Sequence, residues 1–307
     1  MSEASEGVMQ GYPEVAVTDD GGFLVVWERL GGSAAASGIR ARRYDDQAQA
    51  LGAVYPVEEG VSAAERQPAL SKAPDGSFLV TYSVTGDSLR GRRLDPDGVP
   101  VGAELLLDTG DHFAGSSVSH NDNGDVLAVW RRTGGPAGRL FDSAGLPLGP
   151  EIDLPGMPSI STRPTSTFAG GRFLATAVTD GQAQGQFFDP AGTPLGSPFV
   201  IGDDVFTLLG VAGAPSTNDE VQLVWTGPDG LGVGIFTGRF SNTGVLVDDV
   251  RRVNSSTSGD NLQPDVAVDD TGRPVIVWRG RVNGAVGVLG CFELPGEEIF
   301  LDGFEST

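Results

Sequence analysis

Six short apolar runs recur along the chain at nearly equal intervals, and this repeat constrains the fold more than any other feature. The runs are similar in sequence, as in FLVVW, VLAVW, VQLVW and PVIVW, and four of them end in tryptophan. Their last residues lie 47 to 55 residues apart. These residues are Trp27, Tyr82, Trp130, Ala177, Trp225 and Trp278. A period of this length is typical of repeat architectures in which each repeat is one unit of supersecondary structure.

Each repeat carries four segments that suit β-strands. A short β-type segment, such as PEVAV at 13–17, precedes a turn rich in Asp, Asn and Gly. The apolar run follows, and its nearly continuous apolar character is typical of a strand covered on both faces. A third segment ends in an aromatic residue or leucine and an acid, as in RRYD at 42–45, and a fourth strand follows, as in VYPV at 54–57. The pattern predicts an all-β fold, a six-bladed β-propeller with four antiparallel strands per blade.

An acidic residue ends the third segment in five repeats and is usually followed three residues later by glycine. An aspartate opens a type I turn and a glycine closes it, so we expect these acids to accept backbone N–H groups. They are Asp45, Asp95, Asp142, Asp189 and Glu293. The fifth repeat has Ser241 in place of the acid and lacks a clean Asp-Gly turn before its apolar run. We therefore expect the fifth blade to be less regular.

The repeats predict one propeller domain at 13–302, after a lead-in at 1–12 and before a tail at 303–307. The blades are expected at about 13–67, 68–115, 116–163, 164–210, 211–263 and 264–302. Too few residues precede Pro13 to supply an outer strand for the sixth blade. That strand is therefore expected at Glu298–Leu301. A short turn at 61–67 is the only segment that suits a helix.

The repeat resembles one found in many large secreted or surface proteins of bacteria. The clearest stretch reads VNSSTSGDNLQPDVAV at 253–268, followed by Asp-Thr-Gly and the run to Trp278. The family unit is similar: V-N, a polar stretch, Q-x-P-x-V-A, D-x-G, an apolar run to W, then R-F-D-x-x-G. The resemblance covers about 13–302 and implies a β-propeller-like fold without an assigned activity. The segment IFLDGFE at 299–305 also resembles a C-terminal motif of exported Gram-negative proteins, which implies an extracellular or cell-surface location.

Charge and composition exclude several classes of partner. The chain has 41 acidic and 20 basic residues, for a net charge of −21, which disfavours nucleic acid as a partner. No apolar run reaches the roughly 18 residues of a membrane span, so we expect no membrane insertion. The single cysteine, Cys291, permits no intramolecular disulfide and is predicted to be a buried core thiol. The first residues lack a signal-peptide pattern.

Two sets of basic residues are candidates for ligand binding. Lys72 and His120 occupy equivalent positions at the ends of first strands and break the apolar pattern there. First strands line the central channel of a β-propeller, so the two residues are predicted to face one end of that channel. The alternative is that both are surface side chains. A second set recurs at one third-strand position and comprises Arg42, Arg92 and Arg139. These arginines either form structural ion pairs or offer a ring of guanidinium groups to carboxylated or sulfated glycans.

Two acidic turns resemble parts of calcium-binding loops. They are DPDG at 95–98 and NDNGD at 121–125, although neither has the full spacing of such a loop. The metal candidates are therefore Asp95, Asp97, Asp122 and Asp125, with Ca²⁺ as the ion. The alternative is that these carboxylates only close their turns. No other cofactor is expected.

No cluster of catalytic residue types distinguishes one repeat from the others. This favours a non-enzymatic, secreted or surface module that binds a glycan or a protein. Two alternatives stay open. One is a polysaccharide hydrolase or lyase with paired carboxylates at a channel mouth. The other is a structural spacer within a longer surface protein.

Overall fold

Each of the six repeats forms a sheet of four antiparallel strands. The computed structural model describes residues 9–31, 37–60, 65–84, 86–110, 112–132, 134–154, 163–179, 181–205, 210–254, 261–282, 285–294 and 297–301. In this part of the chain nearly all regular structure is β-strand, apart from a 3₁₀ turn at Thr217–Asp219. None of its helical segments has the length and apolar character to cross a membrane.

The strands of each sheet are consecutive in the sequence. Sheets 1 to 3 contain β1 (Met9–Val17), β2 (Phe23–Leu30), β3 (Gly38–Tyr44), β4 (Ala50–Pro56); β5 (Glu65–Lys72), β6 (Phe78–Val84), β7 (Ser88–Leu94), β8 (Pro100–Thr109); and β9 (His112–His120), β10 (Val126–Arg132), β11 (Gly135–Phe141), β12 (Ile152–Asp153). Sheets 4 to 6 contain β13 (Thr165–Ala169), β14 (Arg172–Thr179), β15 (Gln182–Phe188), β16 (Pro194–Gly202); β17 (Val211–Pro215), β18 (Val221–Pro228), β19 (Val233–Phe240), β20 (Arg251–Arg252); and β21 (Leu262–Val268), β22 (Pro274–Val282), β23 (Ala285–Leu294), β24 (Glu297–Leu301). The last of these confirms that the C-terminal segment supplies the outer strand of the sixth sheet, since β24 pairs with β23.

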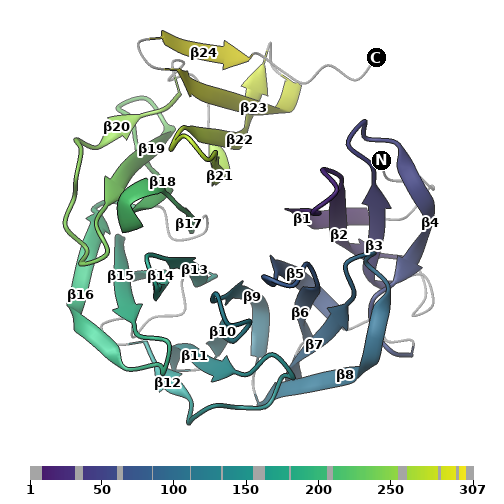
Figure 1. Ribbon diagram of the computed structural model, residues 1–307. Helices are drawn as coiled ribbons and strands as arrows, with labels where there is room; N and C mark the ends of the chain where they lie inside the picture. The colour runs from purple at the N-terminus through teal and green to yellow at the C-terminus, as the bar shows by residue number, and fades with distance from the viewer. Residues whose placement is uncertain are drawn as a thin grey trace. The chain divides into compact units, whose positions relative to one another are not determined.

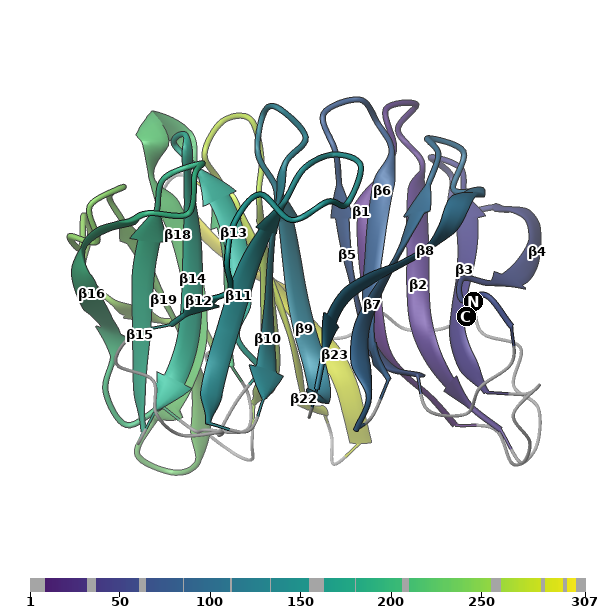
Figure 2. The same cartoon turned by 90° about the horizontal axis from the view of Figure 1, so that it is seen from below.

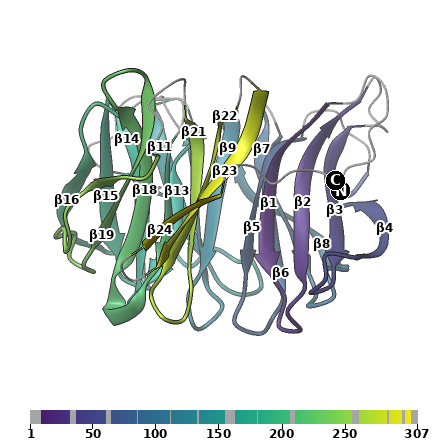
Figure 3. The same cartoon turned by 90° about the horizontal axis from the view of Figure 1, so that it is seen from above.

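Contacts within the chain group the sheets into two units, Met1–Asp153 and Leu154–Thr307, with three sheets in each. Within the first unit, the first strands β1, β5 and β9 lie next to one another, as Figure 1 shows. Within the second unit, β13, β17 and β21 have the same relation. Figure 3 shows β1, β2 and β3 as adjacent strands of one sheet. In each unit, therefore, first strands meet first strands.

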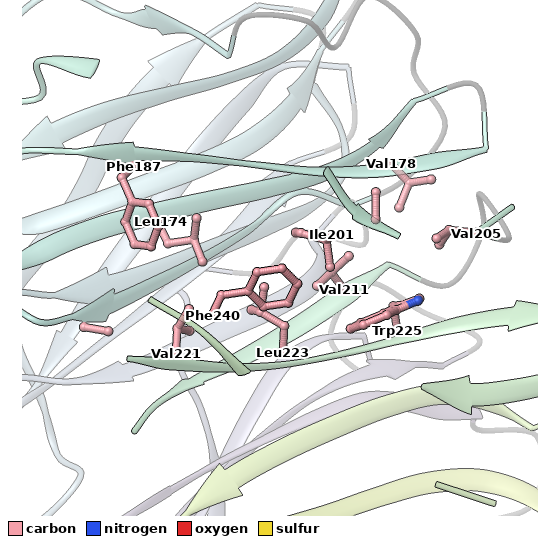
Figure 4. Close-up of a cluster of buried hydrophobic side chains, with 12 residues drawn as sticks. Leu174, Val178, Phe187, Ile201, Val205, Val211, Val221, Leu223, Trp225 and Phe240 are labelled. Carbon is pink, nitrogen blue, oxygen red and sulfur yellow. The ribbon is translucent and has the colours of Figure 1, made fainter. Parts of the chain in front are cut away.

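The hydrophobic core lies between the faces of neighbouring sheets. Between sheets 4 and 5, Leu174 and Phe187 from one sheet pack with Leu223, Trp225 and Phe240 from the other (Figure 4). Similar clusters lie between sheets 1 and 2, between sheets 2 and 3, and between sheets 5 and 6. Face-to-face packing of this kind buries apolar side chains that no single sheet can cover.

The anchor residues of the repeat belong to this core, as the sequence predicts. The exposed fractions of Trp27, Trp130, Trp225 and Trp278 are 8%, 0%, 3% and 4%. Ala177, which takes the same place in sheet 4, is 4% exposed. Cys291 is likewise buried, in the cluster between sheets 5 and 6. The tryptophans are thus packing residues rather than exposed platforms for a ligand.

The recurring aspartates close the turn between the third and fourth strands, which confirms their predicted role. Asp95 Oδ1 accepts the backbone N–H groups of Asp97 and Val99 at 3.0 and 2.8 Å. Gly98 follows with a φ of 82°, in the left-handed region that glycine tolerates. The same pair of bonds forms at Asp45, Asp142 and Asp189. The side chain of Glu293 lies outside the described residues.

Ser241 takes over this role in sheet 5. Its Oγ accepts the N–H groups of Thr243 and Val245 at 3.3 and 3.2 Å. The irregularity expected in the fifth repeat lies instead in its first hairpin, where Asn218 and Asp219 have φ values of 61° and 60° within the 3₁₀ turn. The hydroxyl is therefore a sufficient acceptor for the third-to-fourth turn.

Four first strands, β1, β5, β9 and β21, begin earlier than the sequence pattern indicates. The helical turn expected at 61–67 is wrong for its last three residues, which belong to β5. In β1, β5 and β21 the reason is a bulge. Tyr12, Gln67 and Gln263 have φ values of 51°, 45° and 54°, each directly before a proline. The pairing register shifts across all three positions. A proline at a bulge interrupts the ladder without ending the strand. Residues 61–64 lie outside the described part.

We expect Trp130→Ala to lower the free energy of unfolding by about 3–5 kcal/mol, because it removes a fully buried ring from the core between sheets 2 and 3. Urea unfolding followed by circular dichroism measures the change. Leu231→Ala is the control, since Leu231 is 80% exposed and its loss should change the same free energy by less than about 0.5 kcal/mol. Equal effects of the two substitutions would contradict the packing described above.

Candidate ligand-binding groove in the first unit

The hairpins β1–β2, β5–β6 and β9–β10 bring polar residues together at one end of the first unit. Figure 2 shows the β5–β6 and β9–β10 hairpins at the same end of their sheets. Lys72 pairs with Phe78 and His120 with Val126, each at the last position of its first strand. Both residues line a hollow of about 360 Å³, together with Asp19, Asn121 and Asp122. The structure therefore brings the two sequence candidates into one site.

Specific contacts hold both candidate side chains. Lys72 Nζ forms an ion pair with Asp19 Oδ1. His120 Nδ1 lies 2.8 Å from Ser71 Oγ. Burial lowers the pKa of His120 to about 4, although the carboxylate of Asp75 acts in the opposite direction. The imidazole is accordingly neutral at pH 7 and forms one hydrogen bond with the Ser71 hydroxyl.

A larger groove of about 680 Å³ lies between sheets 2 and 3, and we call it the sheet 2/3 groove. It adjoins the hollow, since His120 and Asp122 line both. Its accessible apolar wall includes the exposed Pro74, Pro96 and Val101 and the half-buried Leu105. The other large apolar residues that line it belong to the buried core: Leu79, Leu94, Leu107, Val126 and Phe141. Polar and charged residues line it as well, and they include Asp75, Ser77, Arg93, Asp95, Asp122, Asn123 and Asp142. An apolar surface with a few polar groups around it is the usual character of a small-ligand site.

The carboxylate of Asp75 is held in its ionised form. Its Oδ1 accepts the backbone N–H of Ser77 at 3.0 Å and the Ser77 hydroxyl at 2.6 Å. These hydrogen bonds keep the pKa of Asp75 below its ordinary value. Asp75 is therefore a hydrogen-bond acceptor at the groove and is poorly suited to donate a proton at neutral pH.

The three recurring arginines make contacts within their own sheets or with a neighbouring loop. Arg42 Nε donates to the carbonyl of Gly52 at 3.1 Å, and Arg139 Nε donates to the carbonyl of Gly149 at 2.9 Å. Arg92 forms an ion pair with Glu59. The ion-pair interpretation thus describes Arg92, whereas the other two arginines bind carbonyl groups near the fourth strand.

The four metal candidates lie at two separate turns. Asp95 is engaged by its own turn, as described above, and Asp97 Oδ1 pairs with Arg43 at 2.6 Å. Asp125 Oδ2 accepts the Asn121 amide at 3.2 Å, while Asp122 lines the hollow and the groove. Within the described ranges, no group of three or more His, Cys, Asp or Glu side chains is arranged to hold a metal ion. Calcium binding stays a prediction.

Arg93 and Ser71 are site residues that the sequence reasoning missed. Arg93 lines the groove and follows Arg92, which attracted attention because it recurs. Ser71 precedes Lys72 in a strand, so its side chain points to the other face, where it meets His120. Aligning the turns after the third strands would have shown that the neighbourhood of Arg93 differs between repeats. The distance from Arg93 to the next sheet cannot be read from a sequence.

Comparison with known proteins supports the fold and leaves the family unassigned. No protein-family model matches the chain, and no curated protein matches it. Solved structures do match. The β-propeller domain of the Trilobed protease from Pyrococcus furiosus is 8% identical with a TM-score of 0.55, and the match covers 97% of this chain and 84% of that one. At this level of identity the likeness shows the fold, a β-propeller, which confirms the predicted six blades of four strands.

Two further solved structures share this fold over most of their length. The SapL1 lectin, solved in complex with alpha methyl fucoside, is 13% identical with a TM-score of 0.59, and the match covers 96% of this chain and 94% of that one. An alpha-L-arabinanase of Penicillium chrysogenum, complexed with arabinobiose, is 14% identical with a TM-score of 0.59, and the coverage is 91% and 92%. The fold is thus shared with both a sugar-binding protein and a sugar-cleaving enzyme.

We expect the stability of the protein to depend on the protonation of His120. The folded protein holds this histidine neutral down to a pKa of about 4, whereas the unfolded chain takes up the proton below pH 6.5 or so. The free energy of unfolding should therefore fall as the pH drops from about 6.5 to 4, by at most about 3 kcal/mol. His120→Gln keeps a hydrogen-bonding side chain and removes this titration.

Urea unfolding of both proteins between pH 4 and pH 7.5 separates this contribution from that of the carboxylates. The difference between the two unfolding free energies should change with pH in the stated window. Parallel pH profiles would mean that His120 is solvated and titrates normally.

Proposed function

We propose that this chain is a secreted or cell-surface recognition module that binds a glycan in the sheet 2/3 groove. The observation that supports the proposal is the composition of the groove, an apolar wall next to carboxylate, hydroxyl, amide and guanidinium groups. A sugar ring presents C–H groups on its faces and hydroxyl groups around its edge. It can therefore use both parts of such a surface.

The fold neighbours are compatible with this proposal. The SapL1 lectin has the same fold and was solved in complex with alpha methyl fucoside. The resemblance of the repeats to those of large secreted bacterial proteins, and of the C-terminal segment to an export motif, supports an extracellular or surface location. The excess of acidic residues disfavours nucleic acid as the partner.

A polysaccharide hydrolase is the second candidate, and the carboxylates around the groove are the observation that favours it. Asp75, Asp95, Asp122 and Asp142 all line the groove, and the arabinanase of Penicillium chrysogenum shares the fold. Glycoside hydrolysis requires a carboxyl group with a raised pKa as the proton donor. The pKa of Asp75 moves the other way, which favours binding over cleavage at this residue.

The test is a glycan-array screen of the full chain in calcium and, separately, in chelator. We expect specific binding to one class of glycan, and loss of the signal in chelator would place calcium in the site. Incubating the binding glycan with the protein and analysing the products by mass spectrometry tests the second candidate. Cleavage of the glycan would show that the chain is a hydrolase rather than a recognition module. Absence of binding and of turnover for every glycan would leave the scaffold and spacer alternatives.

Filling the groove should abolish binding without unfolding the protein. Ser143 is exposed at the groove, on the turn between β11 and the fourth strand. We expect Ser143→Trp to weaken glycan binding at least about tenfold, because the indole occupies the groove. Asp46 holds the equivalent exposed position in sheet 1 and lines neither cavity. Asp46→Trp is therefore the matched control and should bind as the unaltered chain does. Equal affinities for all three proteins would place the glycan elsewhere.

A further inference from the structure

Arg93 in the sheet 2/3 groove has a counterpart, Arg43, at the same position of sheet 1. Each precedes the turn aspartate of its sheet by two residues, and each lies opposite a leucine of the second strand, at Leu24 and Leu79. Both side chains reach the turn between the third and fourth strands of the following sheet. The two arginines can therefore be compared directly.

The guanidinium group of Arg43 is held by two carboxylates. Its Nη2 lies 2.5 Å from Asp20 Oδ2, and its Nη1 lies 2.6 Å from Asp97 Oδ1. Asp20 belongs to the first hairpin of the same sheet, and Asp97 to the turn of the next sheet. Hydrogen bonds from Thr18 and Arg43 lower the pKa of Asp20 to about 2. Through these two ion pairs, Arg43 joins sheet 1 to sheet 2.

Arg93 has neither of the two ion pairs that hold Arg43. The residue equivalent to Asp97 is Ala144, since both donate their backbone N–H to the turn aspartate two residues earlier. The residue equivalent to Asp20 is Asp75, which accepts hydrogen bonds from Ser77 and makes no ion pair with Arg93. In the described part of the chain, no carboxylate lies within ion-pair distance of Arg93.

The remaining contacts of Arg93 are weak. Its Nη1 lies 3.4 Å from the carbonyl oxygen of Ser143. Its Nε is buried and has no hydrogen-bond partner among the described residues. Arg43 Nε is buried without a partner in the same way, so the two arginines differ at their terminal nitrogens, which pair with carboxylates in Arg43 and only with the Ser143 carbonyl in Arg93. A guanidinium group without a carboxylate partner favours a ligand that brings a hydrogen-bond acceptor. Because Arg93 lines the groove, an acceptor in the groove is the group placed to meet it.

The other charges of the groove decide the kind of acceptor. Asp75, Asp95, Asp122 and Asp142 line the same surface, and His120 is neutral. Carboxylates outnumber the guanidinium group there, and the whole chain has a net charge of −21. An anionic ligand would meet like charge around the one cation. An uncharged sugar avoids this repulsion, since its hydroxyl oxygens accept from Arg93 and its hydroxyl hydrogens donate to the carboxylates.

We infer that Arg93 contacts the ligand in the sheet 2/3 groove and that this ligand is an uncharged saccharide. The inference rests on the proposed glycan-binding function. Ala144 leaves Arg93 without the carboxylate that Asp97 gives to Arg43, so Arg93 is a hydrogen-bond donor for the ligand at a position where sheet 1 uses the same residue type to join two sheets.

The experiment restores the missing carboxylate and removes the donor. Ala144→Asp places a carboxylate at the position of Asp97, and Ala144 is exposed, so the fold tolerates the change. Arg93→Ala removes the guanidinium group. We expect each variant to bind a neutral glycan at least about tenfold more weakly than the unaltered chain. Gln47 is the equivalent turn residue in sheet 1, also exposed, and Gln47→Asp adds the same charge there without changing affinity.

The ligand class is tested with four sets of immobilised glycans: neutral, uronic-acid-containing, sulfated and amino-sugar-containing. We expect binding to neutral glycans, with an affinity that changes less than about twofold between 50 mM and 500 mM NaCl, because no ion pair with the ligand is formed. Binding only to sulfated or uronic glycans, with loss at high salt, would overturn the ligand class. Binding only to amino sugars would also overturn it.

The variants separate this inference from the proposed function. Thermal unfolding monitored by circular dichroism verifies that each variant is folded. If Ser143→Trp abolishes binding while Arg93→Ala and Ala144→Asp leave it unchanged, the groove binds a glycan and the role of Arg93 is wrong. If no glycan of any set binds the unaltered chain, the proposed function fails and this inference fails with it.

Discussion

The fold depends on apolar side chains that are buried between the faces of neighbouring sheets. The four strands of each sheet pair with one another, but a single sheet cannot cover its own apolar second strand. Leu174 and Leu223, for example, are fully buried only because they share one cluster across two sheets. The position of each sheet is therefore set by its neighbour within the unit, and the groove between sheets 2 and 3 is a place where this packing leaves space open to a ligand.

Periodicity made the fold predictable from the sequence. The tryptophans marked the second strands because burial on both faces requires a continuous apolar run, and Trp130 and Trp225 are buried as expected. The strand starts were less predictable, because Pro68 looked like a boundary but lies within β5 at a bulge. A proline in a sequence does not reveal whether the ladder ends there or only shifts.

The site was predictable only in part. Lys72 and His120 were identified because they interrupt an apolar pattern, and the structure places both at one hollow. The recurring arginines attracted attention because they repeat, yet repetition is the mark of a structural role, as the carbonyl contacts of Arg42 and Arg139 illustrate. Arg93 was overlooked because its significance lies in partners that are absent. Nothing in the sequence around an arginine reveals that the neighbouring sheet lacks a carboxylate to pair with it.

The turn between the third and fourth strands has one position at which different repeats carry different side chains: Gln47, Asp97 and Ala144 in the first three sheets. The backbone of the turn is fixed by the preceding aspartate, so this position is free to vary without loss of the turn. Asp97 at this position pairs with Arg43 of the preceding sheet, whereas Ala144 offers Arg93 no carboxylate. In a repeated architecture of this kind, a contact between two sheets can therefore change at one turn while the other turns keep the protein folded.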